Sequence, residues 1–234
     1  MGKSTETSPV TKPSRFTPVA AAGERILEAV DLGVKQRWEP ALARAAAATG
    51  ETIEERVDKL TAAFRQELAV AGGAVGGVAA VPGIGTTASI AASTAEFGWS
   101  TVRLADLILS IAAVHGHDSA TVEERRLWVL SILAYGNSAS TMVTRLAGEA
   151  GKGLGKRATA KIPAPALRAI NAKIGRTILT KYGTKRGVVA LGRAFPFGIG
   201  AAIGYGLNAY IVTRTAKSAT SFFSKLAIEV EVEA

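Results

Sequence analysis

The chain has 234 residues, of which 48% are hydrophobic and 6% aromatic, and a formal net charge of +9. It contains no cysteine, which excludes a disulfide framework, a thiolate metal site and a thiol nucleophile. The length suits one domain, and the abundance of Ala and Leu beside 25 glycines predicts an all-α fold of closely packed helices.

Residues 1–19 are rich in Ser, Thr, Pro and Lys and have no apolar run, so we expect a disordered basic tail and no signal peptide. Because no signal peptide is expected, we expect a cytoplasmic protein. The first helix is expected over about 22–48, interrupted near Gly33 or Pro40 and ended by Thr49-Gly50.

Residues 52–55 fit a capping box that opens the next helix. Its apolar side recurs at helical spacing. The members of this side are Ile53, Val57, Leu60, Phe64 and Leu68. No charged residue follows from Leu68 to Ala95, and the Pro and Gly residues within 81–85 predict a helix break there.

A helix over about 87–114 is apolar nearly all round, which predicts that it is buried, with Arg103 and Asp106 as a local ion pair. His115 and His117 follow in a turn. Their spacing with Asp118 permits a metal site, but a polar turn between helices explains them better, because no further ligand is evident.

A second capping box at 121–124 predicts a helix to about Tyr135, and a shorter helix follows to about Ala150. Residues 151–157 suit a flexible basic linker. Pro163 and Pro165 predict the start of an amphipathic helix that reaches Lys181.

Two short patterns resemble each other and predict hairpin turns where helices approach closely. They contain Pro82, Gly83 and Gly85 in the first copy and Pro196, Gly198 and Gly200 in the second. A last helix is expected from 200 to about Ser218. We therefore expect one compact domain over 20–226, with about seven or eight helices and Gly/Pro-hinged hairpins, followed by an acidic tail at 227–234.

No catalytic signature is present, and the sequence assigns no catalytic residue, cofactor or metal. Residues 83–88 match a loose dinucleotide-binding pattern, but the pattern requires a preceding strand, and the run before it reads as helix. No P-loop and no Gly-x-Ser-x-Gly elbow occurs.

The charge is distributed unevenly. Residues 150–228 contain 14 Lys and Arg and no Asp or Glu. Such a stretch must face solvent, the acidic half of the chain, or an anionic partner. The candidate anion-facing or lipid-facing residues are Arg168, Lys173, Arg176, Lys181, Lys185, Arg186 and Arg193.

Two uncharged stretches, 68–95 and 194–213, are long enough on paper to cross a bilayer, which takes about 20 residues. Each contains a Pro-Gly break and is rich in Ala and Gly, which favours soluble core helices. Helical hairpins that enter one leaflet, or true spans, are the alternative.

Four segments carry a resemblance to a known family: 103–118, 123–130, 173–181 and the turn at 195–200. Their pattern of helices, glycines and charges resembles the bacterial EcsC family, over roughly 51–223. This resemblance implies a helical fold and, because the family takes its name from an operon that encodes an ABC transporter, a role compatible with the cytoplasmic face of the membrane. It supplies no catalytic residues.

We therefore expect a non-enzymatic protein that associates peripherally with the cytoplasmic face of the membrane through its basic C-terminal half. Its partner would be anionic lipid or a membrane protein. The alternative is a soluble module that binds an acidic protein or a nucleic acid. The oligomeric state is not specified by the sequence.

Overall fold

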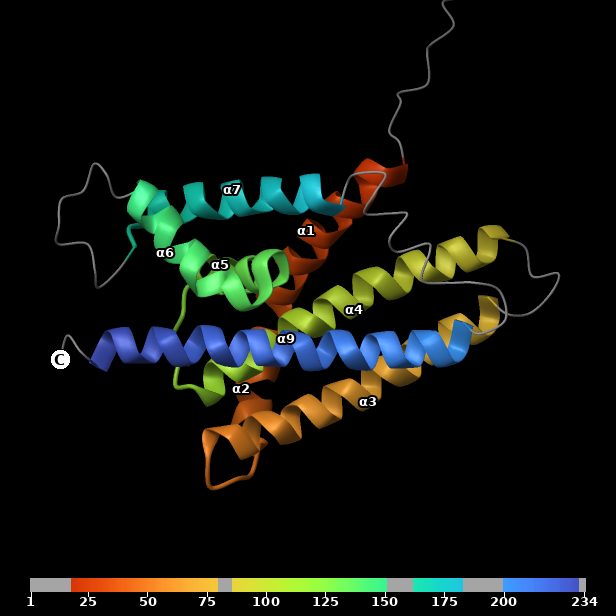
Figure 1. Cartoon of the computed structure of the whole chain (residues 1–234), viewed down its shortest axis with the longest axis horizontal. Helices are drawn as coiled ribbons and strands as arrows, with labels where there is room; N and C mark the ends of the chain where they lie inside the picture. The colour runs from red at the N-terminus through yellow and green to blue at the C-terminus, as the bar shows by residue number, and fades with distance from the viewer. Residues whose placement is uncertain (1–17, 80–85, 151–161, 183–199, 232–234) are drawn as a thin grey trace, which may run out of the picture.

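The computed structural model describes residues 18–79, 86–150, 162–182 and 200–231 (Figure 1). These residues form α-helices and one short 3-10 turn, and no strand occurs among them. The all-α fold predicted from the sequence is confirmed.

The first half of the chain forms four helices, of which the second pair is long. They are α1 (Pro18–Gln36), α2 (Trp38–Ala47), α3 (Ile53–Ala79) and α4 (Thr86–Val114). The second half supplies shorter helices and a long final one: α5 (Val122–Tyr135), the turn η1 (Gly136–Ser138), α6 (Ala139–Ala150), α7 (Ala164–Tyr182) and α9 (Gly200–Glu231).

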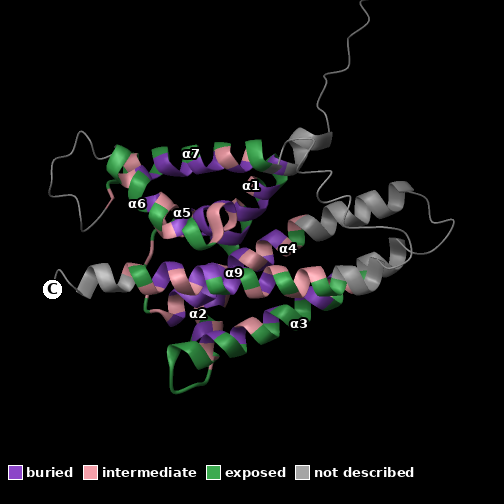
Figure 2. Ribbon diagram, in the orientation of Figure 1, coloured by how far each residue is buried: buried purple, intermediate pink, exposed green. Residues whose placement is uncertain are grey.

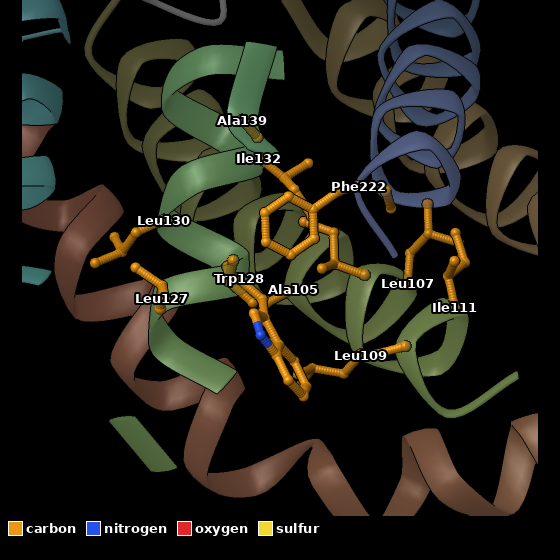
Figure 3. Packing of buried hydrophobic residues seen from close by; sticks show 14 of the residues in the cluster. Ala105, Leu107, Leu109, Ile111, Leu127, Trp128, Leu130, Ile132, Ala139 and Phe222 are labelled. Atoms are coloured by element: carbon orange, nitrogen blue, oxygen red, sulfur yellow. The ribbon is translucent and has the colours of Figure 1, made fainter. Parts of the chain in front are cut away.

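The second half of α4 is the centre of the core. Leu107, Ile108, Leu109 and Ile111 are fully buried, because α1, α2, α3, α5 and α9 all contact this helix. The sequence places apolar residues on every side of this helix, and in the structure these residues pack against neighbouring helices on every side. Phe222 of α9 and Trp128 of α5 pack with it (Figure 3), and buried residues concentrate where these helices meet (Figure 2).

Helices α3 and α9 run antiparallel and lie side by side, and α4 packs on both (Figure 1). Two contacts fix their relative level. The Asn208 amide of α9 donates to the Leu68 carbonyl oxygen of α3 at 2.9 Å, and Arg103 of α4 pairs with Glu67 of α3. From this level the second part of α3 and the first parts of α4 and α9 continue away from α2 and α5.

Local signals placed most helix starts correctly. The Thr121 hydroxyl accepts from the Glu124 amide while the Glu124 carboxylate accepts from the Thr121 amide, which completes the predicted capping box. At α3 the Thr52 hydroxyl accepts from the Glu55 amide, but the Glu55 carboxylate accepts from the amide of Glu51. The expected interruption of the first helix falls between α1 and α2, at Arg37.

Some expectations differ from the structure. Ile53, predicted on the apolar side of its helix, is 40% exposed because it is the first residue of α3. The last helix continues to Glu231 and not only to Ser218, so it includes part of the residues assigned to the acidic tail. Of the predicted hairpin turns, Pro82, Gly83, Gly85, Pro196 and Gly198 lie outside the described residues, and Gly200 is the first residue of α9.

Within the described ranges, none of the helices combines the length and the hydropathy that crossing a bilayer requires.

Candidate functional site

The basic residues predicted to meet an anionic partner lie partly on the outer side of α7. Arg168 and Arg176 are exposed and form no ion pair with any described residue. Lys173 is also exposed, but its Nζ lies 2.6 Å from Glu149 Oε2. This hydrogen bond from Lys173, with a second from Arg145, lowers the pKa of the Glu149 carboxyl. The acidic half of the chain therefore compensates part of this face.

Lys181 does not share that face, because its Nζ donates to the Ala134 carbonyl oxygen of α5 at 2.8 Å. The apolar side of α7 is buried in the core, where α7 packs on α1, α5 and α6, so the side open to solvent carries the charged residues together with small and polar ones. The structure thus matches an outer helix with a solvated face. The other candidates, Lys185, Arg186 and Arg193, lie outside the described residues.

A second surface lies where α3, α4 and α9 extend beyond the level of Glu67 and Arg103. No charged residue occurs from Leu68 to Ala95 or from Gly200 to Thr213. We call residues 68–79 of α3, 86–95 of α4 and 200–213 of α9 the uncharged end; on α4, Glu96 lies between this end and Trp99. At its base, the described residues that face solvent are apolar or small rather than charged.

Large apolar side chains are exposed around this base. Val70 of α3 is 59% exposed, Trp99 of α4 is 40% exposed and Tyr205 of α9 is 50% exposed. Each lies within about one helical turn of the Glu67–Arg103 and Leu68–Asn208 contacts, toward the uncharged end. Tyr210 is exposed slightly nearer the body, and Arg214 donates to its hydroxyl at 3.0 Å. Three helices therefore present apolar and aromatic side chains at one level.

A third feature lies just below that base. Asp106 of α4 is fully buried, and three arginines converge on its carboxylate. The Arg37 Nε donates to Oδ2 at 2.7 Å, the Arg44 Nη1 donates to Oδ1 at 2.6 Å, and Arg103 donates from one turn away on the same helix. We call Arg37, Arg44 and Arg103 the arginine cluster.

Phe64 of α3 supports the arginine cluster from one side. The guanidinium carbon of Arg103 lies 4.7 Å from the centre of its ring, and that of Arg44 lies 5.4 Å from it. The sequence predicted the pair Arg103–Asp106 correctly. It did not reveal Arg37 and Arg44, because no local signal in the sequence links them to Asp106.

A pocket of about 350 Å³ opens against this cluster. The three arginines line it together with Glu67, Gln36 and Trp99. Arg37 and Arg44 reach the pocket with side chains 27% and 32% exposed, whereas that of Arg103 is 10% exposed. The arrangement is suited to hold an anion.

The turn predicted at His115 and His117 is more apolar than its sequence indicates. The His117 ring lies 5.5 Å from the Phe223 ring and 5.7 Å from the Trp128 ring, measured between centroids. Burial lowers the pKa of both imidazoles, and the charge of His117 lowers that of His115 further. Over the described ranges, no group of three or more His, Cys, Asp or Glu lies close enough to hold a metal ion.

The loose dinucleotide pattern at 83–88 follows helix α3 and not a strand, so the structural context that this pattern requires does not precede it. The chain was also compared with known proteins. No protein-family model, no curated protein and no solved structure matches it. The resemblance to the bacterial EcsC family stays a prediction.

Proposed function

We propose that this protein associates peripherally with the cytoplasmic face of a membrane that contains anionic lipid. The observation that supports this proposal most directly is the uncharged end with its exposed Val70, Trp99 and Tyr205. Trp and Tyr side chains favour the membrane–water boundary, because they combine an apolar ring with a polar group.

The length of the uncharged end suits shallow insertion. From Leu68 to Ala79, α3 rises about 16 Å at about 1.5 Å per residue. A hydrocarbon core about 30 Å thick has leaflets of about half that depth. In this orientation the uncharged end enters one leaflet, and Glu96 lies with the tyrosine and tryptophan side chains at the level of the headgroups, because it is only about 4.5 Å along α4 from Trp99.

Charge supplies the attraction toward the surface. Basic residues near an anionic membrane contribute about 1 kcal/mol each. Arg168 and Arg176 are available for this because neither is paired with a described carboxylate. They lie on α7, whose main contacts in the described part of the chain are with α1, α5 and α6 and not with the three helices of the uncharged end, so salt reduces their contribution below this value and they act mainly by steering the approach.

Sedimentation of the full chain with vesicles tests the proposal. We expect binding to vesicles that contain anionic lipid and at least tenfold weaker binding to neutral vesicles of the same size. Val70→Asp places a charge in the uncharged end and should weaken vesicle binding at least tenfold. Val122→Asp is the matched control, because Val122 is 43% exposed at the start of α5, and it should change binding less than twofold.

If both aspartate variants bind vesicles as the unchanged protein does, the uncharged end is not the contact. If the unchanged protein binds neither kind of vesicle, membrane association itself is wrong. The remaining candidate function is then binding of an acidic protein or nucleic acid, which Arg168 and Arg176 favour because both are exposed and neither pairs with a described carboxylate. That function requires that Arg168→Glu with Arg176→Glu abolish binding and that binding decline steeply with salt.

A further inference from the structure

The arginine cluster has more positive charge than its carboxylates neutralise. Arg37, Arg44 and Arg103 share Asp106, and Arg103 also pairs with Glu67. Three guanidinium groups against two carboxylates leave one positive charge. A buried aspartate requires one cation, and each further arginine brought to the same carboxylate is repelled by the others. Neutralising Asp106 therefore does not account for the whole cluster.

The excess charge is open to a ligand. Arg37 and Arg44 keep about a quarter to a third of their side chains exposed, and both line the pocket of about 350 Å³. Arg103 lines it as well, with a side chain that is 10% exposed.

From this geometry we propose that the pocket binds a phosphate group. Guanidinium groups donate paired hydrogen bonds to phosphate oxygens, and a tetrahedral ligand accepts from several directions at once. The three arginines approach from α4, from α2 and from the junction of α1 with α2, so they suit such a ligand better than a planar carboxylate. Gln36 also lines the pocket and has a neutral polar side chain.

The position of the pocket admits two sources for the phosphate. Trp99 lines it and also lies at the base of the uncharged end, where lipid headgroups lie in the proposed orientation. The ligand is therefore either the phosphate of a lipid headgroup or a free phosphate or phosphate ester. The site itself does not depend on membrane association, so it is tested separately.

Calorimetric titration of the full chain with inorganic phosphate and with glycerol 3-phosphate tests the free source. Arg44→Gln removes one pocket guanidinium while Asp106 keeps Arg37 and Arg103, and it should weaken binding at least tenfold. Arg65→Gln removes an exposed arginine of α3 outside the pocket and should change binding less than twofold. Gln36→Glu adds a negative charge to the pocket wall without touching Asp106, so it tests the site even if Arg44→Gln does not fold.

Vesicles that contain phosphatidic acid test the lipid source. Binding of free phosphate that Gln36→Glu weakens supports the site with a soluble ligand. Binding of phosphatidic acid vesicles alone, weakened by Gln36→Glu and not by Arg65→Gln, supports it with a lipid headgroup. The proposal is overturned if neither probe binds, or if Arg65→Gln reduces binding as much as the pocket variants do. If Val70→Asp is the only variant that reduces binding to the vesicles, the result supports membrane contact and counts against the phosphate site.

Discussion

At the residue scale, Asp106 connects α4 to the segment where α1 meets α2. Its carboxylate has no solvent exposure and accepts from three arginines. Asp106→Asn keeps the size of the side chain but leaves three guanidinium groups together with Glu67 as their one carboxylate partner among the described residues. We expect a loss of about 3 kcal/mol in the free energy of unfolding, because removing one member of a buried ion pair strands the others. Urea denaturation measures it.

Asp58→Asn is the control for that substitution, since Asp58 is exposed on α3. It should change the free energy of unfolding by less than about 0.5 kcal/mol. Equal effects of the two variants would mean that the arginine cluster does not hold the helices together.

The two histidines make stability depend on pH. Burial lowers the pKa of His115 and His117 below the ordinary value of 6.5. Between the lowered and the ordinary pKa the unfolded chain binds more protons than the folded chain does. The contribution of the two neutral histidines to the free energy of unfolding is therefore fully present above about pH 6.5. It is lost as the pH decreases through the lowered pKa values. Urea denaturation at several pH values from 7 to 5 should show this decline.

Replacing both histidines with glutamine removes these titrating groups, so the double variant should be nearly insensitive to pH over the same window. The window lies above the ordinary pKa of Asp and Glu, which keeps carboxylates out of the comparison. A double variant with an unchanged pH dependence would assign the decline to other groups.

At the element scale, the approach of α1 to α4 depends on one glycine. A Cβ placed on Gly33 would lie 2.8 Å from the Cβ of Ala105, closer than packed side chains come. Gly33→Ala should push the two helices apart and cost about 1–3 kcal/mol, although alanine favours helix more than glycine does. Thermal denaturation should show a lower melting temperature.

Gly148→Ala is the matched control, because Gly148 lies inside α6 with open space around it. There the same substitution should stabilise the protein by about 0.5–1 kcal/mol. If both variants shift the melting temperature in the same direction, close packing at Gly33 is not the deciding factor.

The difference between local and long-range contacts explains how far the sequence could predict the elements. Capping residues act over three or four positions, so the start of α5 at Thr121 was readable. The continuation of α9 to Glu231 was not, because no local signal ends or extends that helix. Arg37 and Arg44 lie 69 and 62 residues from Asp106, and no local pattern links positions so distant. Hence the buried pair was predicted while the pocket beside it was not.

At the scale of the whole molecule, the anion-facing residues predicted on α7 and the exposed aromatic residues lie on different helices. Helix α7 packs on α1, α5 and α6 and carries Arg168 and Arg176, whereas the exposed aromatic residues belong to α4 and α9. The two surfaces predict different orientations on a membrane. Contact through α7 would leave Trp99 in water, and contact through the uncharged end would bring it to the headgroups.

Tryptophan fluorescence distinguishes these orientations. Trp38 and Trp128 are buried, at 8% and 7% exposure, while Trp99 is 40% exposed, so a change on vesicle binding reports mainly on Trp99. We expect anionic vesicles to shift the emission to shorter wavelength, because the indole leaves water for a less polar layer. In Trp99→Phe the shift should disappear while sedimentation with vesicles persists. Binding without any shift in the unchanged protein would place α7, and not the uncharged end, against the membrane.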